Sequence, residues 1–281
     1  MVDWPLTFKC NNNCLSCIFD TRQTPRMGNP FLWQIKNVID SMAEDGSLCF
    51  TGGEPTLRKE MFTILEYTRK KHPNMYIFLV TNGRAFASKN FTKRLADLKL
   101  GNFMVGIAFY GHIREIHEEI TRAPKSYEQF VKGTENLLKH GIDVELRIIV
   151  NKINYKSMSD MARFISKEFR GVKRVVFINM KYTGNAFIHR KDIFVKITES
   201  NPYVEKAADI LLKNGFDVKL FHFPFCTIKE KYWDLAKGVT KQSVELMFVK
   251  ACDDCGMREE CPMIWKTYHV IAGDDEFKSI K

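Results

Sequence analysis

The chain has 281 residues, 45% of them hydrophobic and 27% charged, so it is long enough to bury a substantial core. The formal charge of +10 favours anionic partners, but the basic residues are spread thinly and name no partner class. No stretch approaches the roughly 18 to 20 apolar residues of a membrane span, and no signal-like segment opens the chain. We therefore expect a soluble, cytoplasmic protein that is not associated with a membrane.

Short apolar runs rich in strand formers alternate with amphipathic segments over the first 180 residues. A strand-to-strand spacing of about 30 to 40 residues fits successive right-handed βαβ crossovers. The pattern predicts an α/β fold, a partial (β/α)6 barrel with active-site residues at the carboxyl ends of its strands. The predicted strands are residues 4–8, 48–51, 76–80, 103–109, 144–150 and 175–180, and the predicted helices are 31–42, 59–71, 127–140 and 157–169.

The rhythm changes after residue 180. A polar linker (181–191) precedes a helical stretch (203–214), an apolar strand (218–221) and a cysteine-bearing tail. We place a boundary near residue 185, which divides the chain into a partial barrel (1–185) and a small cysteine-rich extension (186–281).

Three cysteines follow the first predicted strand in the stretch KCNNNCLSC. Cys10, Cys14 and Cys17 have the spacing C-x3-C-x2-C. Three soft thiolates can hold three irons of a cubane cluster and leave the fourth iron open to a ligand. A structural zinc site is the alternative, but it requires four protein ligands, and no further His or Cys follows nearby.

The second predicted strand ends in the sequence CFTGGEP (residues 49–55). Gly52 and Gly53 let the backbone approach a ligand closely, and exposed backbone groups together with Glu54 can accept hydrogen bonds from an ammonium group. A Gly-Gly turn alone is a weak signal, but it becomes strong beside the cysteine motif. Cys49 points from a buried strand and is expected to belong to the core rather than to a metal site.

With these two motifs in this order, residues 1–180 resemble the radical S-adenosylmethionine enzymes. The resemblance implies a 4Fe-4S cluster on Cys10, Cys14 and Cys17, with S-adenosylmethionine bound to the open iron through its amino and carboxylate groups. In that family, one-electron reduction releases a 5′-deoxyadenosyl radical. The resemblance also implies an electron donor such as flavodoxin or ferredoxin.

The same resemblance assigns cofactor contacts. Gly52, Gly53 and Glu54 match the element that receives the methionine ammonium, and the VTNGR stretch after the third strand matches a further cofactor-facing position. Arg147 and Asn151 are candidates for the carboxylate or ribose, although Arg147 could instead be an ion-pair partner. The cofactor-binding candidates are Ser16, Thr51, Gly52, Gly53, Glu54, Thr81, Asn82, Arg147 and Asn151.

The chain departs from the family at two positions. Ser16 stands where the family often has an aromatic residue, which puts the usual adenine-stacking contact in doubt. After the fourth strand the family often has a serine followed by Asp-Gly, whereas this chain reads AFYG at residues 108–111. We therefore expect different ribose contacts.

A second cysteine group lies in the tail. Cys252, Cys255 and Cys261 form C-x2-C-x5-C, and Cys226 precedes them in FHFPFC. Four thiolates can hold one zinc or one 4Fe-4S cluster. The tail resembles the SPASM or Twitch extensions of radical S-adenosylmethionine enzymes but lacks their later C-x3-C element, which implies one auxiliary cluster, with zinc as the alternative.

Several segments resemble the His-Xaa-Ser system maturases, which are associated with ribosomally made peptides. The match includes KYTGNAF, KYWDLAKG and CDDCGMREEC. The leading hypothesis is hydrogen abstraction from a peptide, leading to a crosslink, epimerisation or oxidation, with the auxiliary cluster accepting an electron. The residues indicate no acid, base or hydrogen donor on the substrate side, and Tyr110, His112, Tyr182 and His222 are left unassigned.

Three other functions stay open. Radical chemistry on a small molecule, such as a sugar or nucleotide, would use the same machinery. The charge permits tRNA modification, but nucleic acid is disfavoured because no RNA-binding module is recognisable. A non-enzymatic protein with two structural metal sites would have no evident need for the Gly-Gly-Glu turn.

Overall fold

The computed structural model describes residues 1–237 and 243–281, and within them one parallel sheet forms the core. Its strands lie side by side in chain order. The α/β prediction is confirmed, with one correction: the sheet has seven strands rather than six. The strands are β1 (Val2–Thr7), β2 (Ser47–Gly52), β3 (Tyr76–Thr81), β4 (Phe103–Ala108), β5 (Asp143–Val150), β6 (Arg174–Asn179) and β7 (Asp217–Phe221).

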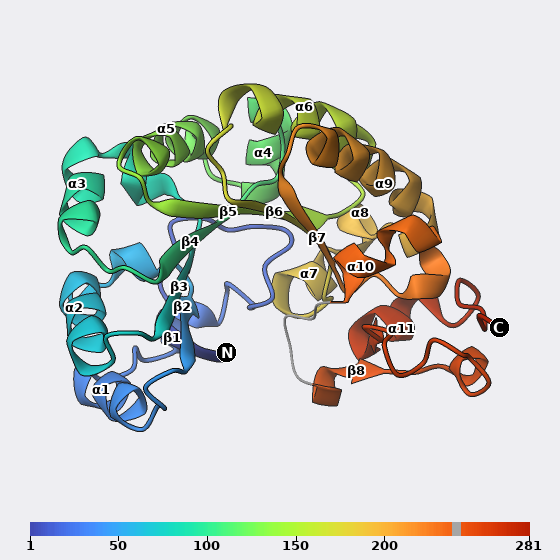
Figure 1. Ribbon diagram of the computed structural model, residues 1–281, viewed down its shortest axis with the longest axis horizontal. Helices are drawn as coiled ribbons and strands as arrows, with labels where there is room; N and C mark the ends of the chain where they lie inside the picture. Colours follow the sequence, from blue (N-terminus) through green and yellow to red (C-terminus); the bar gives the residue numbers. More distant parts are fainter. Residues whose placement is uncertain (238–242) are drawn as a thin grey trace.

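Helices return the chain between successive strands and cover the outer face of the curved sheet (Figure 1). The curvature makes an open barrel with β1 and β7 at its two edges. No helix among the residues described is long and apolar enough to cross a bilayer. The helices of this region are α1 (Leu32–Asp40), α2 (Met61–Lys71), α3 (Lys89–Asp97), α4 (Arg114–Thr121), α5 (Ser126–Lys139), α6 (Met158–Glu168), α7 (Gly184–Ile188), α8 (Arg190–Ile193) and α9 (Ile197–Lys213).

Side chains alternate between the two faces of each strand. Phe50, Leu79 and Val105 point outward into the main apolar core beneath the helices. Cys49 and Phe78, at neighbouring register positions of β2 and β3, point inward and pack with a β4 residue in a small separate cluster. The outer face of the sheet, and the inner face where β2, β3 and β4 meet, are therefore apolar, which explains why these strands read as nearly continuous hydrophobic runs.

The sheet continues past the boundary expected near residue 185. β7 pairs in parallel with β6, with Phe177 opposite Leu220, so the region after residue 185 contributes one strand to the barrel. Beyond β7 come α10 (Trp233–Ala236), a two-stranded antiparallel sheet of β8 (Leu246–Met247) and β9 (Ile264–Trp265), and α11 (Lys266–Ala272).

Two histidines are buried among aromatic rings. His117 of α4 stacks on Phe130 with ring centroids 5.2 Å apart, and His222, just after β7, lies 3.9 Å from the Trp265 ring. Burial, helped by Arg84, lowers the pKa of His117 from 6.5 to about 3. Burial, helped by Arg147, lowers the pKa of His222 to about 3. Both rings are therefore neutral in the folded protein at neutral pH.

The low pKa values predict acid sensitivity. Below pH 6.5 these two histidines become protonated in the unfolded chain, whereas in the folded chain they stay neutral down to about pH 3. The free energy of unfolding therefore decreases as the pH falls from 6.5 to about 3. Each histidine should contribute a slope of about 1.4 kcal/mol per pH unit. In the variant His117→Phe, the new ring would still pack against Phe130 but has no group that can be protonated. Urea unfolding of the metal-free protein between pH 7 and pH 4 should give a shallower slope for His117→Phe, and equal slopes would contradict the explanation.

Candidate functional site

The hollow of the barrel holds a cavity of about 960 Å³. It extends from the inner face of the sheet to the loop after β1, and its wall includes inward side chains of β2 to β6. The cavity is thus open to the carboxyl ends of the strands, where parallel α/β sheets place their functional groups.

The three N-terminal cysteines lie together on this cavity. Cys10, Cys14 and Cys17 all contribute to its wall. Burial raises the pKa of Cys10 to about 11. It also raises the pKa of Cys14 and of Cys17, and for Cys14 the charges of the other two cysteines add to the effect. Three thiolates at this position would therefore need a positively charged group beside them.

The donor set fits an iron–sulfur cluster. Thiolate is the ligand that these clusters require, and a group carrying iron charge would offset the unfavourable deprotonation of buried, mutually repelling thiols. The three cysteines supply three ligands, and the cavity leaves room beside them for a further ligand.

The Gly-Gly turn packs directly against the backbone that leads into the cysteines. Gly53 N donates to Thr7 O at 2.7 Å, and Glu54 N donates to Lys9 O at 2.8 Å. A Cβ on Gly53 would lie 2.3 Å from Lys9 O, and Gly52 has φ +130°, a region that side chains rarely adopt. Glycine is therefore required here by the close approach of two backbones.

The Glu54 carboxylate is fully buried and accepts four hydrogen bonds. Oε1 accepts from Thr56 N (3.1 Å), Thr56 Oγ1 (2.6 Å) and Thr81 Oγ1 (2.7 Å), and Oε2 accepts from Asn82 N (2.7 Å). Burial raises the pKa of Glu54, and these hydrogen bonds act against the rise. Through these hydrogen bonds the side chain joins the ends of β2 and β3.

Asn82 and Arg84 continue this network to the cysteine loop. Asn82 Nδ2 donates to Asn11 Oδ1 at 2.7 Å, and Arg84 Nη1 donates to Asn11 O at 2.5 Å and to Asn12 Oδ1 at 2.7 Å. The residues between the first two cysteines are therefore held from the end of β3. No local sequence signal pointed to Arg84.

Most cofactor candidates of the sequence lie on the cavity wall. Arg147 does so while paired with Glu145 (2.5 Å) and placed over the Phe78 ring. Asn151 is buried in the turn after β5, where it accepts from Ile153 N and donates to Ile149 O. The candidates on the wall are Ser16, Thr51, Gly52, Gly53, Thr81, Asn82 and Arg147.

Ser16 and Tyr110 mark the positions where the chain departs from the family pattern. The Ser16 side chain is buried, lines the cavity and lies beside the Tyr110 hydroxyl. Tyr110, which follows β4, lines the same cavity, where burial and the neighbouring Cys14 raise its pKa well above the usual range. Both hydroxyls are thus placed beside the cysteines.

The other unassigned side chains lie in different surroundings. Tyr182 is buried against the Tyr268 ring, with centroids 6.2 Å apart, and His112 accepts a hydrogen bond from Tyr127 at its backbone oxygen. Lys181 and Trp265 also line the cavity, and no sequence pattern indicated this. Trp265 reaches the wall from the tail, which only the folded chain brings there.

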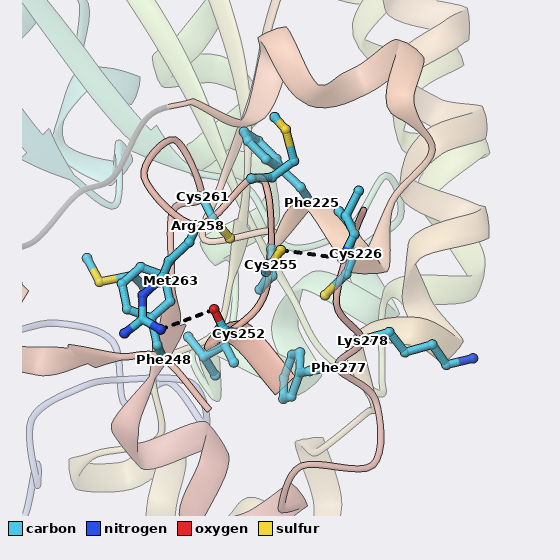
Figure 2. A pocket seen from close by; sticks show the side chains of 14 residues that line it. Phe225, Cys226, Phe248, Cys252, Cys255, Arg258, Cys261, Met263, Phe277 and Lys278 are labelled. Atoms are coloured by element: carbon cyan, nitrogen blue, oxygen red, sulfur yellow. Dashed lines mark hydrogen bonds between the residues drawn. The ribbon is translucent and has the colours of Figure 1, made fainter. Parts of the chain in front are cut away.

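The four tail cysteines surround a second, small cavity of about 20 Å³ (Figure 2). Burial raises the pKa of Cys226 and of Cys261, and the charges of the other tail cysteines add to the rise. Among residues 1–237 and 243–281, no three His, Cys, Asp or Glu side chains converge closely enough to hold one metal ion. The tail thiols therefore share a cavity without meeting at one point. They are Cys226, Cys252, Cys255 and Cys261.

A family model of the Radical SAM superfamily matches residues 4–165. The chain is 28% identical over 186 residues to Fe-coproporphyrin III synthase of Methanosarcina barkeri, covering 66% of this chain and 45% of that protein. It is 25% identical over 229 residues to GTP 3′,8-cyclase of Nautilia profundicola, covering 76% of this chain and 68% of that protein. The chain spans about half the length of the first of these relatives.

A solved structure of similar fold is SuiB of Streptococcus suis bound to the precursor peptide SuiA. The TM-score is 0.64 with 12% identity, and the match covers 78% of this chain and 48% of SuiB. At this identity the likeness concerns the fold.

The contact between Gly53 and Lys9 O generates a prediction. In Gly53→Ala, the added methyl group should push the backbone before Cys10 aside, lowering the free energy of unfolding by about 1–3 kcal/mol. It should also reduce the iron and sulfide bound per chain after anaerobic reconstitution. Gly28→Ala is the control, because a Cβ there meets nothing within 4 Å. Equal iron contents in the two variants would show that the close approach does not position the cysteines.

Proposed function

Because the chain belongs to the radical SAM superfamily and is therefore an enzyme of that class, we propose that it cleaves S-adenosylmethionine reductively at a 4Fe-4S cluster held by Cys10, Cys14 and Cys17. The observation that carries the proposal is the placement of all three thiols on one cavity together with the Gly-Gly turn and the end of β3. The cluster, when bound, would supply the electron that cleaves the cofactor and starts radical chemistry.

The chain's own residues would bind and orient the cofactor. Gly52 and Gly53 line the cavity, so their backbone would receive the methionine ammonium, beside the Glu54 carboxylate that accepts four hydrogen bonds from the protein. Asn82 at the end of β3 faces the same cavity, and the Arg147 guanidinium offers charge for a carboxylate. Ser16, which lines the cavity, would contact the cofactor through its hydroxyl.

The proposed substrate is a ribosomally made peptide, which would be crosslinked, epimerised or oxidised after hydrogen abstraction. Two observations support this choice. The fold resembles SuiB, whose structure holds a precursor peptide. The net charge of +10 also suits an acidic peptide. An external donor such as flavodoxin or ferredoxin would supply the electron.

A small-molecule substrate is the second candidate. The match to the GTP 3′,8-cyclase extends over 229 residues and covers 68% of that protein. A cavity of about 960 Å³ lies within the usual size range of small-molecule sites. Hydrogen abstraction from a nucleotide or another compact molecule would then take place inside the barrel.

We propose that the tail, within residues 186–281, carries one auxiliary 4Fe-4S cluster on its four cysteines. The four thiols around one cavity would supply four ligands, and the resemblance of the tail to SPASM or Twitch extensions favours a cluster over a single zinc ion. The cluster would accept an electron from the substrate side or pass one on.

Cofactor cleavage is the first test. Anaerobically reconstituted, reduced protein should convert S-adenosylmethionine to 5′-deoxyadenosine and methionine, measured by liquid chromatography. The triple variant Cys10→Ala, Cys14→Ala, Cys17→Ala should lose this conversion entirely because no ligands for the cluster remain. Cys49→Ala, a matched change at an inward-facing cysteine of β2, should retain it. An intact cluster without any cleavage would sink the proposal.

The tail metal is tested in the same triple variant, which leaves only the second cysteine group. About four irons and four sulfides per chain are expected if a cluster forms there. Removing Cys226 and Cys261 as well should abolish that iron. One zinc per chain, with no sulfide and no visible absorption, would contradict the auxiliary cluster and leave a structural zinc site.

A further inference from the structure

The loop of residues 10–21, here called the cysteine loop, is fastened by a side chain from far along the sequence. Asn185 of α7 is 2% exposed, and its Nδ2 donates to Cys14 O (3.0 Å), Asn13 Oδ1 (3.2 Å) and Thr21 Oγ1 (2.9 Å). Its Oδ1 accepts from Thr21 N at 3.1 Å. One amide therefore joins the beginning and the end of the loop.

The backbone of α7 makes the same connection. Asn185 N donates to Phe19 O and Ala186 N donates to Cys17 O, each at 3.0 Å. Gly184 has φ +55°, and a Cβ there would lie 2.3 Å from the carbonyl carbon of Phe19. The start of α7 thus lies in backbone contact with the residues at and just after the third cysteine.

The residues just before α7 contact the tail. Tyr182 N donates to Thr267 Oγ1 at 3.1 Å, and Lys181 Nζ pairs with Glu245 at 2.5 Å. Residues 181–186, here called the bridge, therefore lie between the cysteine loop and the tail, as the central position of α7 in Figure 1 shows.

A second apolar core unites the same three parts. Leu15, which lies between the second and third cysteines of the loop, packs in one buried cluster with Tyr182 and Ala186 of the bridge and with Ile264 of the tail. Cys226 and other tail side chains beside the small cavity pack against this cluster. The cysteine loop thus shares an apolar core with two of the tail cysteines, Cys226 and Cys252, while Cys261 packs against the main barrel core.

We propose that metal binding at the tail cysteines makes the cluster on the cysteine loop bind more stably. Asn185 is the positioning residue through which the two sites are coupled. The inference rests on the proposed function of both cysteine groups. A metal in the tail fixes residues flanking the shared core, and binding free energy at such a site is also folding free energy. An ordered core then holds Leu15 and the bridge, which hold the loop.

The coupling is measured as the stability of the loop cluster. The electron paramagnetic resonance signal of the reduced cluster on residues 10–17 should change when S-adenosylmethionine is added, which distinguishes it from the tail cluster. The decay of this signal in the presence of a chelator therefore reports on the loop cluster alone. With Cys226→Ala and Cys261→Ala in the full chain, the signal should decay at least about 5-fold faster than in the parent, the low end of typical couplings between sites. Hydrogen exchange of residues 10–21 should rise in parallel.

Asn185→Ala should accelerate the decay of the signal when the tail cysteines are intact and hold metal. In the variant that lacks Cys226 and Cys261 it should cause little further acceleration, because both changes break the same connection. Thr21→Val, a milder change at the same junction, should act in the same direction. Leu137→Ala controls for general destabilisation, since it removes side-chain volume from the main core of the barrel and touches no part of the loop.

Each outcome is decisive. A tail that takes up no metal overturns the proposed tail site and the coupling with it. If the tail binds metal but the loop cluster is lost at the same rate with and without that metal, the coupling alone is overturned. If the effects of Asn185→Ala and of the tail variant on the decay rate are additive, Asn185 does not couple the two sites. If Leu137→Ala accelerates the decay equally, the effect reflects overall stability rather than coupling.

Discussion

The buried carboxylate of Glu54 is the contact on which the arrangement of the site depends. It closes the ends of β2 and β3 together, and the backbone on either side of it reaches the chain before Cys10 and the amide of Asn82. An unpaired carboxylate in this position would be strongly unfavourable. The four hydrogen bonds that stabilise it therefore also fix where the cysteine loop and the cofactor-facing turns meet.

The barrel supplies rigidity, and the tail completes the site. The sheet buries its outer face under helices and keeps a hollow on the inner face, to which Trp265 contributes from the tail. The floor of this hollow carries compensated charge: Glu145 pairs with Arg147 and lies 3.7 Å from Arg174, which in turn pairs with Asp217. Beside the cysteines, the wall consists of the Gly-Gly turn and the end of β3.

Much of the fold and part of the site could be predicted because their signals are local. Continuous apolar runs mark strands buried on both faces, and the spacings C-x3-C-x2-C and Gly-Gly-Glu reflect chemistry confined to single turns. The role of β7 in the sheet was missed because a short strand after a long helical insertion carries no sign of its partner. Glu54 is predicted from the sequence as a ligand contact, and only the structure shows that its carboxylate accepts four hydrogen bonds within the protein.

The sequence by itself determined the superfamily, the α/β architecture and the cysteines able to bind metal, because each depends on residue type at short spacing. Only the tertiary structure decided that Asn185 fastens the cysteine loop, that Asn151 is buried in a turn, and that Leu15 shares a core with the tail. The physical reason is that hydrogen bonds and apolar packing between segments more than 150 residues apart depend on how the chain folds back on itself. A local sequence pattern does not show which distant segments come into contact.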